Sequence, residues 1–109
     1  MTTNTNKGIK QKIFDLVSQI PKGKIVYYGQ IANIIGVPAQ IVGWQLSGMS
    51  SEQMEQIPWQ RVVAKNGFIS SLKLGSRGLL QKQILLSEGY QLIDDTVDME
   101  FHKFEFTNF

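Results

Sequence analysis

The sequence predicts a mainly α-helical, winged helix-turn-helix DNA-binding domain with a three-helix core, a small β-hairpin wing and a C-terminal helix. Three observations lead to this prediction. Apolar residues recur at helical spacing near the N-terminus, two short apolar segments are joined by a turn that contains glycine, and an Asn-Gly pair lies between two β-type runs. The 109 residues, of which 42% are hydrophobic, suit one domain with a real core.

The first helix is predicted over residues 7–20, ended by Pro21 and the following Lys-Gly-Lys turn. Residues 25–27 would be a short extended entry. The apolar positions of the first helix are Ile9, Ile13, Phe14, Val17 and Ile20.

The second and third helices are predicted over residues 30–35 and 38–46. Gly36 would end one, because glycine adopts the left-handed cap conformation at little cost, and Pro38 would begin the next. The third helix would be the recognition helix. The residues expected to face inward are Ile31, Ile34, Ile35, Ile41, Val42 and Leu46.

A polar loop is predicted over residues 47–58, followed by the wing. Asn66-Gly67 is a strong tight-turn signal, so residues 62–63 and 68–69 are expected to pair as a hairpin. Residues 70–78 would form a mobile basic loop.

The last helix is predicted over residues 79–87, with Gly89 as its stop. An edge strand is expected after it, because Val97, Met99 and Phe101 alternate with polar residues. Phe104 and Phe106 could pack behind that strand.

The composition excludes several kinds of chemistry. The chain has no cysteine, which excludes disulfides, thiolate catalysis and thiolate metal sites, and His102 cannot hold a metal alone. No metal or other cofactor and no catalytic residue is therefore expected. Residues 1–6 would be a flexible tail before a single domain over residues 7–109. Their polar character and the lack of an apolar run of about 20 residues predict a cytoplasmic protein.

Positive charge is concentrated in the first three quarters of the chain. Residues 1–82 carry ten Lys and Arg against three acids, whereas residues 83–109 carry Lys103 against six acids. A basic region beside an acidic tail suits a surface that binds a polyanion, although ordinary solvated charge explains the pattern equally well.

Four segments resemble, in order and spacing, the DNA-binding domain of the alkylguanine-DNA alkyltransferase family across about residues 9–90. They are residues 20–32 (IPKGKIVYYGQIA), 42–43 (VG), 57–63 (IPWQRVV) with Asn66-Gly67, and 85–89 (LLSEG). Repair-competent members read Pro-Cys-His-Arg-Val at the centre, where the cysteine accepts the alkyl group. Here the same positions read Pro58-Trp59-Gln60-Arg61-Val62, as in alkyltransferase-like proteins.

The resemblance implies a monomer that binds O6-alkylguanine in double-stranded DNA through the minor groove. It would flip the base into a pocket, leave the lesion in place and pass it to nucleotide excision repair proteins. The chemistry of the residues agrees, because alkyl transfer from an ether carbon needs a thiolate. Trp59 offers only an N–H donor and a flat surface that could line the pocket.

The resemblance also implies roles for individual residues. Tyr28 would press on a phosphate beside the flipped nucleotide, and Gln40 stands where the family usually inserts an arginine into the duplex. Trp44 is expected to pack on the domain. The implied DNA-binding residues are Tyr28, Ala39, Gln40, Gly43 and Arg61. The implied pocket residues are Tyr28, Trp59, Val62, Leu72, Lys73, Ser76 and Arg77, with residues 72–77 as a lid. Arg61 and Glu88 would form a structural network.

Two other functions remain open at this point. A sequence-specific winged helix regulator would read the major groove, but only Gln40 and Gln45 of the third helix are good base-reading candidates. A protein-interaction module that has lost DNA binding would fit the acidic tail and the missing arginine.

Overall fold

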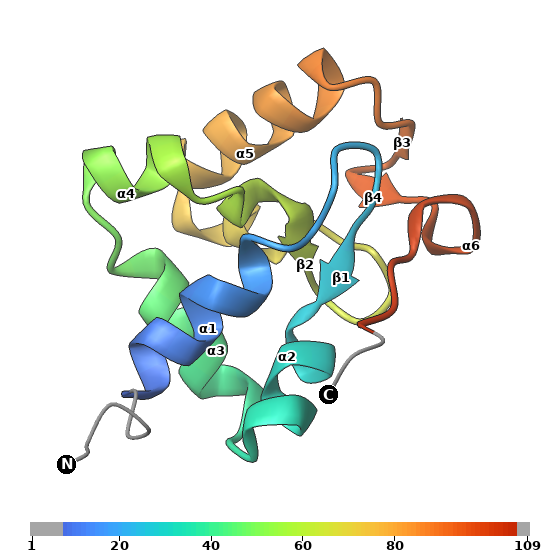
Figure 1. Ribbon diagram of the computed structural model, residues 1–109. Helices are drawn as coiled ribbons and strands as arrows, with labels where there is room; N and C mark the ends of the chain where they lie inside the picture. The colour runs from blue at the N-terminus through green and yellow to red at the C-terminus, as the bar shows by residue number, and fades with distance from the viewer. Residues whose placement is uncertain (1–7, 107–109) are drawn as a thin grey trace, which may run out of the picture.

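Six α-helices, two 3₁₀ helices and two small sheets make up the computed structural model, which describes residues 8–106 (Figure 1). The predicted flexible tail over residues 1–6 lies outside the described residues. The elements are α1 (Ile9–Val17), β1 (Val26–Tyr27), α2 (Tyr28–Ile35), α3 (Ala39–Ser47), α4 (Ser51–Gln56), η1 (Trp59–Arg61), β2 (Val62–Val63), η2 (Ser70–Leu74), α5 (Ser76–Ser87), β3 (Leu92–Ile93), β4 (Thr96–Val97) and α6 (Met99–His102). The mainly helical class is confirmed.

A two-stranded parallel sheet divides the hydrophobic core. β1 pairs with β2 so that Val26 lies opposite Val62, and Tyr27 lies opposite Val63. Successive side chains of a strand point to opposite faces. Val26 and Val62 therefore pack into one cluster, while Ile25 and Val63 pack into the other.

The first cluster lies between α1, α2, α3 and the segment that follows α4. Its buried members are Ile13, Phe14, Leu16, Val17, Ile20, Val26, Ile31, Ala32, Val42, Leu46, Met49, Trp59 and Val62. The second cluster lies under α5 and the C-terminal hairpin, and contains Ile25, Val63, Ile69, Leu85, Tyr90 and Val97. None of the helices within residues 8–106 has the length and apolar character to cross a membrane.

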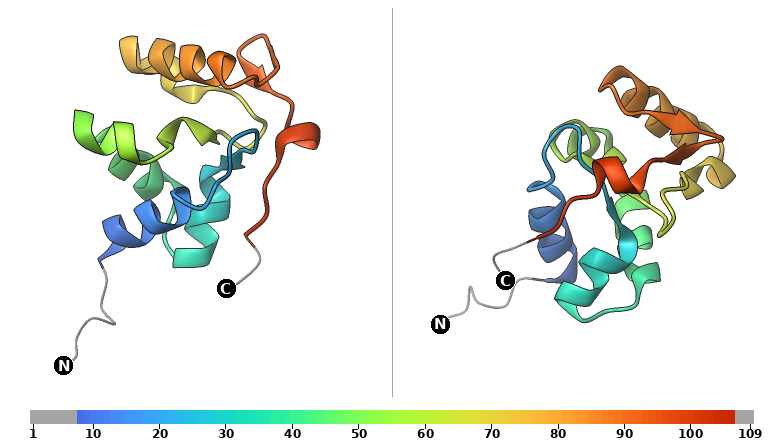
Figure 2. Two further views of the ribbon diagram at one scale, coloured as in Figure 1. Left: turned by 45° about the horizontal axis from the view of Figure 1, so that its top comes forward. Right: turned by 90° about the vertical axis from the view of Figure 1, so that its right-hand side faces the viewer.

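The C-terminal segment runs beside β1 (Figure 2). Ile25 donates its backbone N–H to the carbonyl of His102, and its own carbonyl accepts from the N–H of Phe104, both at 2.8 Å. Phe104 and Phe106 pack against the first cluster, as expected. Residues near the end of the chain thereby cover an edge that β1 would otherwise expose.

The helix-turn-helix prediction is confirmed in α2 and α3. Gly36 has φ 87° and ψ 38°, the left-handed conformation that ends α2, and Pro38 precedes α3 directly. α2 begins two residues earlier than predicted, because the Gln30 side chain accepts the N–H of Tyr27 at 2.9 Å and caps the helix there. Ile34 was expected to face inward but is 38% exposed.

The first helix and the predicted loop after α3 need correction. α1 ends at Val17, and residues 18–20 form a turn that still buries Ile20. The segment predicted to be loop contains α4, whose start is fixed by a capping box. Ser50 accepts the N–H of Gln53 through its hydroxyl, and the Gln53 side chain accepts the N–H of Ser50. That Ser-x-x-Gln signal is visible in the sequence.

The predicted wing hairpin between residues 62–63 and 68–69 is wrong. Both valines of β2 are buried, so they pair in parallel with β1 inside the core, as strands buried on both faces commonly do. The turn at Gly67 exists, with φ 90°. The antiparallel hairpin is β3–β4, where Asp94 and Asp95 have φ 52° and 61°, as a type I′ turn requires.

Two further predictions after residue 69 are wrong. Residues 70–78 form η2 and the first turn of α5 instead of a loop. A Cβ at Gly78 would clash with the backbone of Leu72, so this glycine lets the two elements touch. Met99 and Phe101 lie in α6, not in a strand. The Asp98 carboxylate accepts the N–H groups of the first helical turn, which outweighs the alternating pattern.

Candidate nucleic-acid interface

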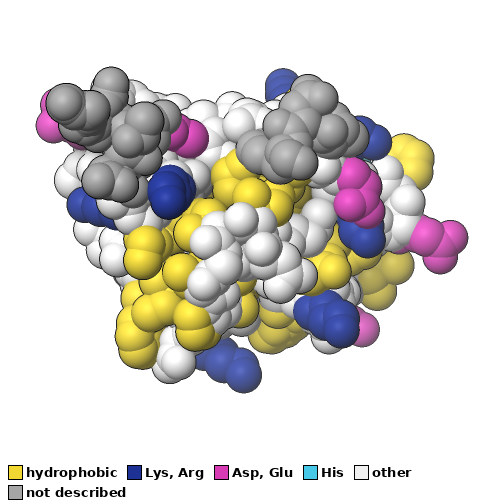
Figure 3. All heavy atoms as spheres, turned by 60° about the horizontal axis from the view of Figure 1, so that its bottom comes forward, with side chains coloured by type: hydrophobic (Ala, Val, Ile, Leu, Met, Phe, Trp, Pro, Cys, Tyr) yellow, Lys and Arg dark blue, Asp and Glu magenta, His cyan; other side chains and the backbone are white. Residues whose placement is uncertain are grey.

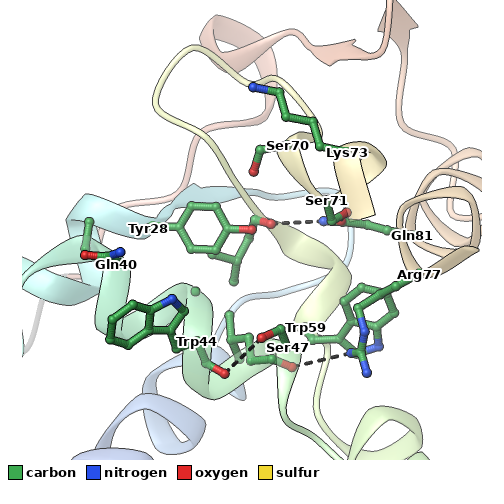
Figure 4. A pocket seen from close by; sticks show the side chains of 14 residues that line it. Tyr28, Gln40, Trp44, Ser47, Trp59, Ser70, Ser71, Lys73, Arg77 and Gln81 are labelled. Atoms are coloured by element: carbon green, nitrogen blue, oxygen red, sulfur yellow. Dashed lines mark hydrogen bonds between the residues drawn. The ribbon is translucent and has the colours of Figure 1, made fainter. Parts of the chain in front are cut away.

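The outer face of α3 forms one wall of a pocket of about 460 Å³. Ala39, Gln40, Gly43, Trp44 and Ser47 recur three or four residues apart, so they lie on one side of the helix and line that wall (Figure 4). Gly36 and Pro38 set the direction in which α3 leaves α2. The recognition helix of the predicted motif therefore borders the pocket.

The remaining wall comes from the end of α3 and from four other parts of the chain. It consists of Tyr28 from α2, Leu46 from α3, Trp59 and Val62 from the central motif, Ser70, Ser71 and Lys73 from η2, and Arg77 and Gln81 from α5. The volume lies in the range of small-molecule sites, and the aromatic walls with a few polar groups suit a planar heteroaromatic ring.

Trp59 lies at the inner end of the pocket. Its side chain is 5% exposed and is also a member of the first hydrophobic cluster. The Arg77 guanidinium lies over the indole, 5.6 Å from the ring centroid, and donates to the Leu46 carbonyl at 3.4 Å. Trp59 therefore lines the pocket and is at the same time part of the hydrophobic core.

Tyr28 closes the pocket from the α2 side. Burial raises the pKa of its phenol above 10.0, and a hydrogen bond with Ser70 lowers it by a smaller amount. The phenol is therefore protonated at neutral pH and can donate a hydrogen bond to a phosphate or a base.

Gln81 organises the wall between Trp59 and Val62. Its side-chain amide donates to the carbonyls of Gln60 and Val62, both at 3.0 Å, and its oxygen accepts from the Ser71 hydroxyl. The side chain is 1% exposed and its hydrogen bonds are satisfied within the protein. The sequence prediction missed Gln81, because a single glutamine in a helix of mixed apolar and polar residues gives no signal of a tertiary partner.

A second hollow, of about 750 Å³, lies on the other side of the Trp59–Arg61 turn. There, Arg61 donates to Glu88 at 2.9 and 3.3 Å and to the Ile20 carbonyl at 2.8 Å. Gln60 donates to the same carboxylate at 3.1 Å. The predicted pairing of Arg61 with Glu88 is confirmed, and it places Arg61 outside the pocket walls.

The structure brings most of the predicted pocket residues together and separates two of them. Tyr28, Trp59, Val62, Lys73 and Arg77 line the pocket. Leu72 packs against the second cluster and Ser76 is exposed at the start of α5, because this segment is helical and not the predicted loop.

Trp44 corrects another expectation. It was expected to pack on the domain, but its side chain is 59% exposed at the pocket wall. On the face drawn in Figure 3, hydrophobic side chains are exposed in patches, with separate Lys and Arg and a few Asp and Glu side chains around them. The structure also adds Leu46, Ser47, Ser70 and Ser71 to the predicted set.

Comparisons with known proteins agree with this geometry. The family model described as 6-O-methylguanine DNA methyltransferase, DNA binding domain, matches residues 8–90. Alkyltransferase-like protein 1 of Schizosaccharomyces pombe is 35% identical over 83 residues, which are 74% of this chain and 75% of that protein. A DNA base-flipping protein of Vibrio parahaemolyticus is 40% identical over 84 residues, which are 74% of this chain and 79% of that protein.

A solved structure is similar over almost the whole chain. It is the crystal structure of S. pombe Atl1 in complex with damaged DNA containing O6-carboxymethylguanine, with a TM-score of 0.76 and 28% identity. The match covers 94% of this chain and 97% of that one. The fold similarity therefore extends beyond the residues that the family model matches.

Proposed function

This chain belongs to the alkyltransferase-like branch of the 6-O-methylguanine DNA methyltransferase family, and from that membership we propose that it binds O6-alkylguanine in duplex DNA without repairing it. One observation carries the proposal. The position of the alkyl acceptor is Trp59, at the inner end of an open pocket, in a chain that has no cysteine. An indole is not a nucleophile for an ether carbon, so the alkyl group stays on the base.

The position of Trp59 supports binding of a base outside the duplex. An alkylguanine stacked within DNA cannot contact a residue that is 5% exposed behind α3. The base must therefore leave the stack and enter between α3 and η2, where Tyr28 and Arg77 line the walls. Gly43 and Ala39 keep the α3 surface low, which suits close approach to the minor groove.

Phosphate contacts and base contacts contribute differently to binding: the first give affinity and the second give discrimination. Lys73 and Arg77 at the pocket provide charge that attracts DNA of any sequence. Discrimination comes from the apolar wall, which gains about 0.8 kcal/mol for each alkyl carbon it buries. We therefore expect affinity to rise with the size of the O6 substituent until the pocket is full.

We also propose that the bound protein marks the lesion for nucleotide excision repair, because a protein that cannot remove the alkyl group must leave it to another system. Its place of action is the compartment that holds the chromosome. Adding the protein to a reconstituted excision system should increase incision of an O6-methylguanine duplex. Unchanged incision would remove this step of the proposal.

The central test is a titration with matched duplexes that contain either O6-methylguanine or guanine at one position. We expect several-fold tighter binding to the lesion, in several flanking sequences. Equal affinity for both duplexes would remove the proposed function, and preference for one flanking sequence would favour a sequence-specific regulator. In a parallel incubation with excess protein, digestion to nucleosides should return O6-methylguanine. Stoichiometric recovery of guanine would contradict the absence of repair.

A further inference from the structure

Trp44 is an exposed aromatic residue at the entrance of the pocket. Its side chain is 59% exposed, whereas Trp59 at the inner end is 5% exposed. Within residues 8–106 its indole has no hydrogen bond, ion pair or ring contact with another side chain, and the contacts of Trp44 with Ser47 and Gly48 go to its backbone carbonyl. Tryptophan has the largest apolar side chain, and here it is exposed to water at the site where we expect DNA to bind.

The neighbours of Trp44 on α3 leave space beside it. Gln40 lies one helical turn earlier on the same side of the pocket, and Figure 4 shows both side chains along α3. Between them, a Cβ at Gly43 would meet only the Tyr28 ring, at 4.0 Å, which is an ordinary contact. Internal packing does not require a glycine there, and glycine weakens a helix. Because Gly43 has no side chain, it leaves a notch on the outer surface of α3 between the Gln40 amide and the Trp44 indole.

Base extrusion leaves a gap in the duplex that must be filled. Proteins that open DNA from the minor groove commonly insert a flat or apolar side chain between base steps. Gln40 has an amide but no extended flat surface, so it can hydrogen-bond the unpaired cytosine without replacing the lost stacking. Trp44 is the side chain of α3 with the required surface, and it is already exposed.

We propose that Trp44 is the wedge of this protein: its indole enters the minor groove beside the extruded base and stacks on the exposed base pair. The proposal rests on the proposed function for the extrusion step. Gln40 then faces the unpaired cytosine, and the Gly43 notch receives the sugar-phosphate backbone. Alanine in place of an aromatic residue that stacks on a base lowers affinity about 5- to 150-fold.

The experiment compares Trp44→Ala and Trp44→Phe with the wild-type protein on three duplexes: guanine, O6-methylguanine, and an abasic site opposite cytosine. The abasic duplex has the gap but no base to extrude. We expect Trp44→Ala to lose affinity for the lesion and abasic duplexes by similar factors within that range, and Trp44→Phe to retain most of it. The matched control is Phe101→Ala, which removes an aromatic that is 69% exposed on α6 and should leave binding unchanged.

The outcomes separate the wedge from the proposed function. A wild-type protein that prefers the lesion while Trp44→Ala binds equally well would overturn the wedge alone. A loss on the lesion duplex without a loss on the abasic duplex would place Trp44 against the extruded base and also overturn it. A wild-type protein without preference for the lesion, but with Trp44-dependent binding of the abasic duplex, would remove the proposed function and retain the wedge. Melting curves should stay close to that of the wild type in all three variants, because both side chains are more than half exposed and Phe101 loses only its edge contact with the His102 ring.

Discussion

On one side of the Trp59–Arg61 turn, the charged and amide groups are paired within the protein, whereas the pocket on the other side combines paired groups such as Gln81 and Arg77 with exposed ones on α3. Arg61 and Gln60 both donate hydrogen bonds to the Glu88 carboxylate and hold the end of α5 against the turn. Facing the pocket, Trp44 and Gln40 are exposed and make no such bonds within the described residues. The comparison teaches that pairing within the fold, and not residue type, distinguishes the structural side from the binding side.

Trp59 lies on the boundary between the two sides, and its replacement should have the largest effect on stability. Because the indole is buried in the first cluster, we expect Trp59→Ala to lower the free energy of unfolding by about 3–5 kcal/mol. Urea denaturation measures this. Trp59→Phe is the control, since it keeps an aromatic wall and should lose less stability while reducing lesion selectivity. An alanine variant of unchanged stability would mean that Trp59 serves the pocket only.

Arg61→Ala should break the paired side without affecting the pocket. The change leaves the Ile20 carbonyl without its donor and the Glu88 carboxylate without its guanidinium, so we expect a loss of about 2–3 kcal/mol of stability. DNA affinity, measured at a temperature where the variant is folded, should stay close to that of the wild type. Lys82→Ala is the control, because its pair with Asp95 is more than a third exposed and should contribute less than about 1 kcal/mol. A large loss of DNA affinity in Arg61→Ala would contradict the division into two sides.

Gln40→Arg should strengthen the binding side. An arginine adds a charge and a stacking plane at an exposed position of the pocket wall, so we expect tighter binding to lesion and undamaged duplexes by about 1–3 kcal/mol. Fluorescence anisotropy at two salt concentrations measures the gain and its electrostatic part. Weaker binding would mean that Gln40 does not lie at the DNA interface.

The smallest expected effect is on the loss of folding stability at alkaline pH. Burial raises the pKa of Tyr28 and of Tyr90 above 10.0 in the folded protein. The folded state then holds these protons at pH values where the unfolded chain has lost them, so stability should fall as pH rises above about 10. Tyr28→Phe and Tyr90→Phe should each flatten part of that fall.

The two tyrosines also differ in location, because Tyr28 lines the pocket and Tyr90 belongs to the second cluster. Tyr90 accepts the N–H of Gly23 at 2.9 Å and donates to the Lys24 carbonyl, so Tyr90→Phe should lower stability at neutral pH as well. Tyr28→Phe should act mainly on DNA affinity. Stability curves from pH 7 to 11 test both, and a Tyr90→Phe variant as stable as the wild type at pH 7 would show that the buried hydroxyl contributes nothing there.

The sequence determined the helix-turn-helix and the central motif by local signals. The end of α2 needs a residue with positive φ, which Gly36 supplies. The Pro58-Trp59 pair marks the position of the lost alkyl acceptor without any coordinates. The capping box between Ser50 and Gln53 is also a local signal, although the sequence prediction did not use it and placed a loop there. Such features depend on neighbours three or four residues apart, which is why sequence patterns carry them.

Only the tertiary structure decided the partners of residues far apart in the chain. The sequence pattern predicts Val62 and Val63 as one strand of a hairpin. In the structure both valines are buried in the core and pair with β1 instead. Gln81 donates to the carbonyls of β2 and of the turn before it, and Trp44 is 59% exposed on the pocket side of α3. Burial and hydrogen-bond satisfaction depend on what the whole chain brings to a place, and the sequence around a residue does not contain that information.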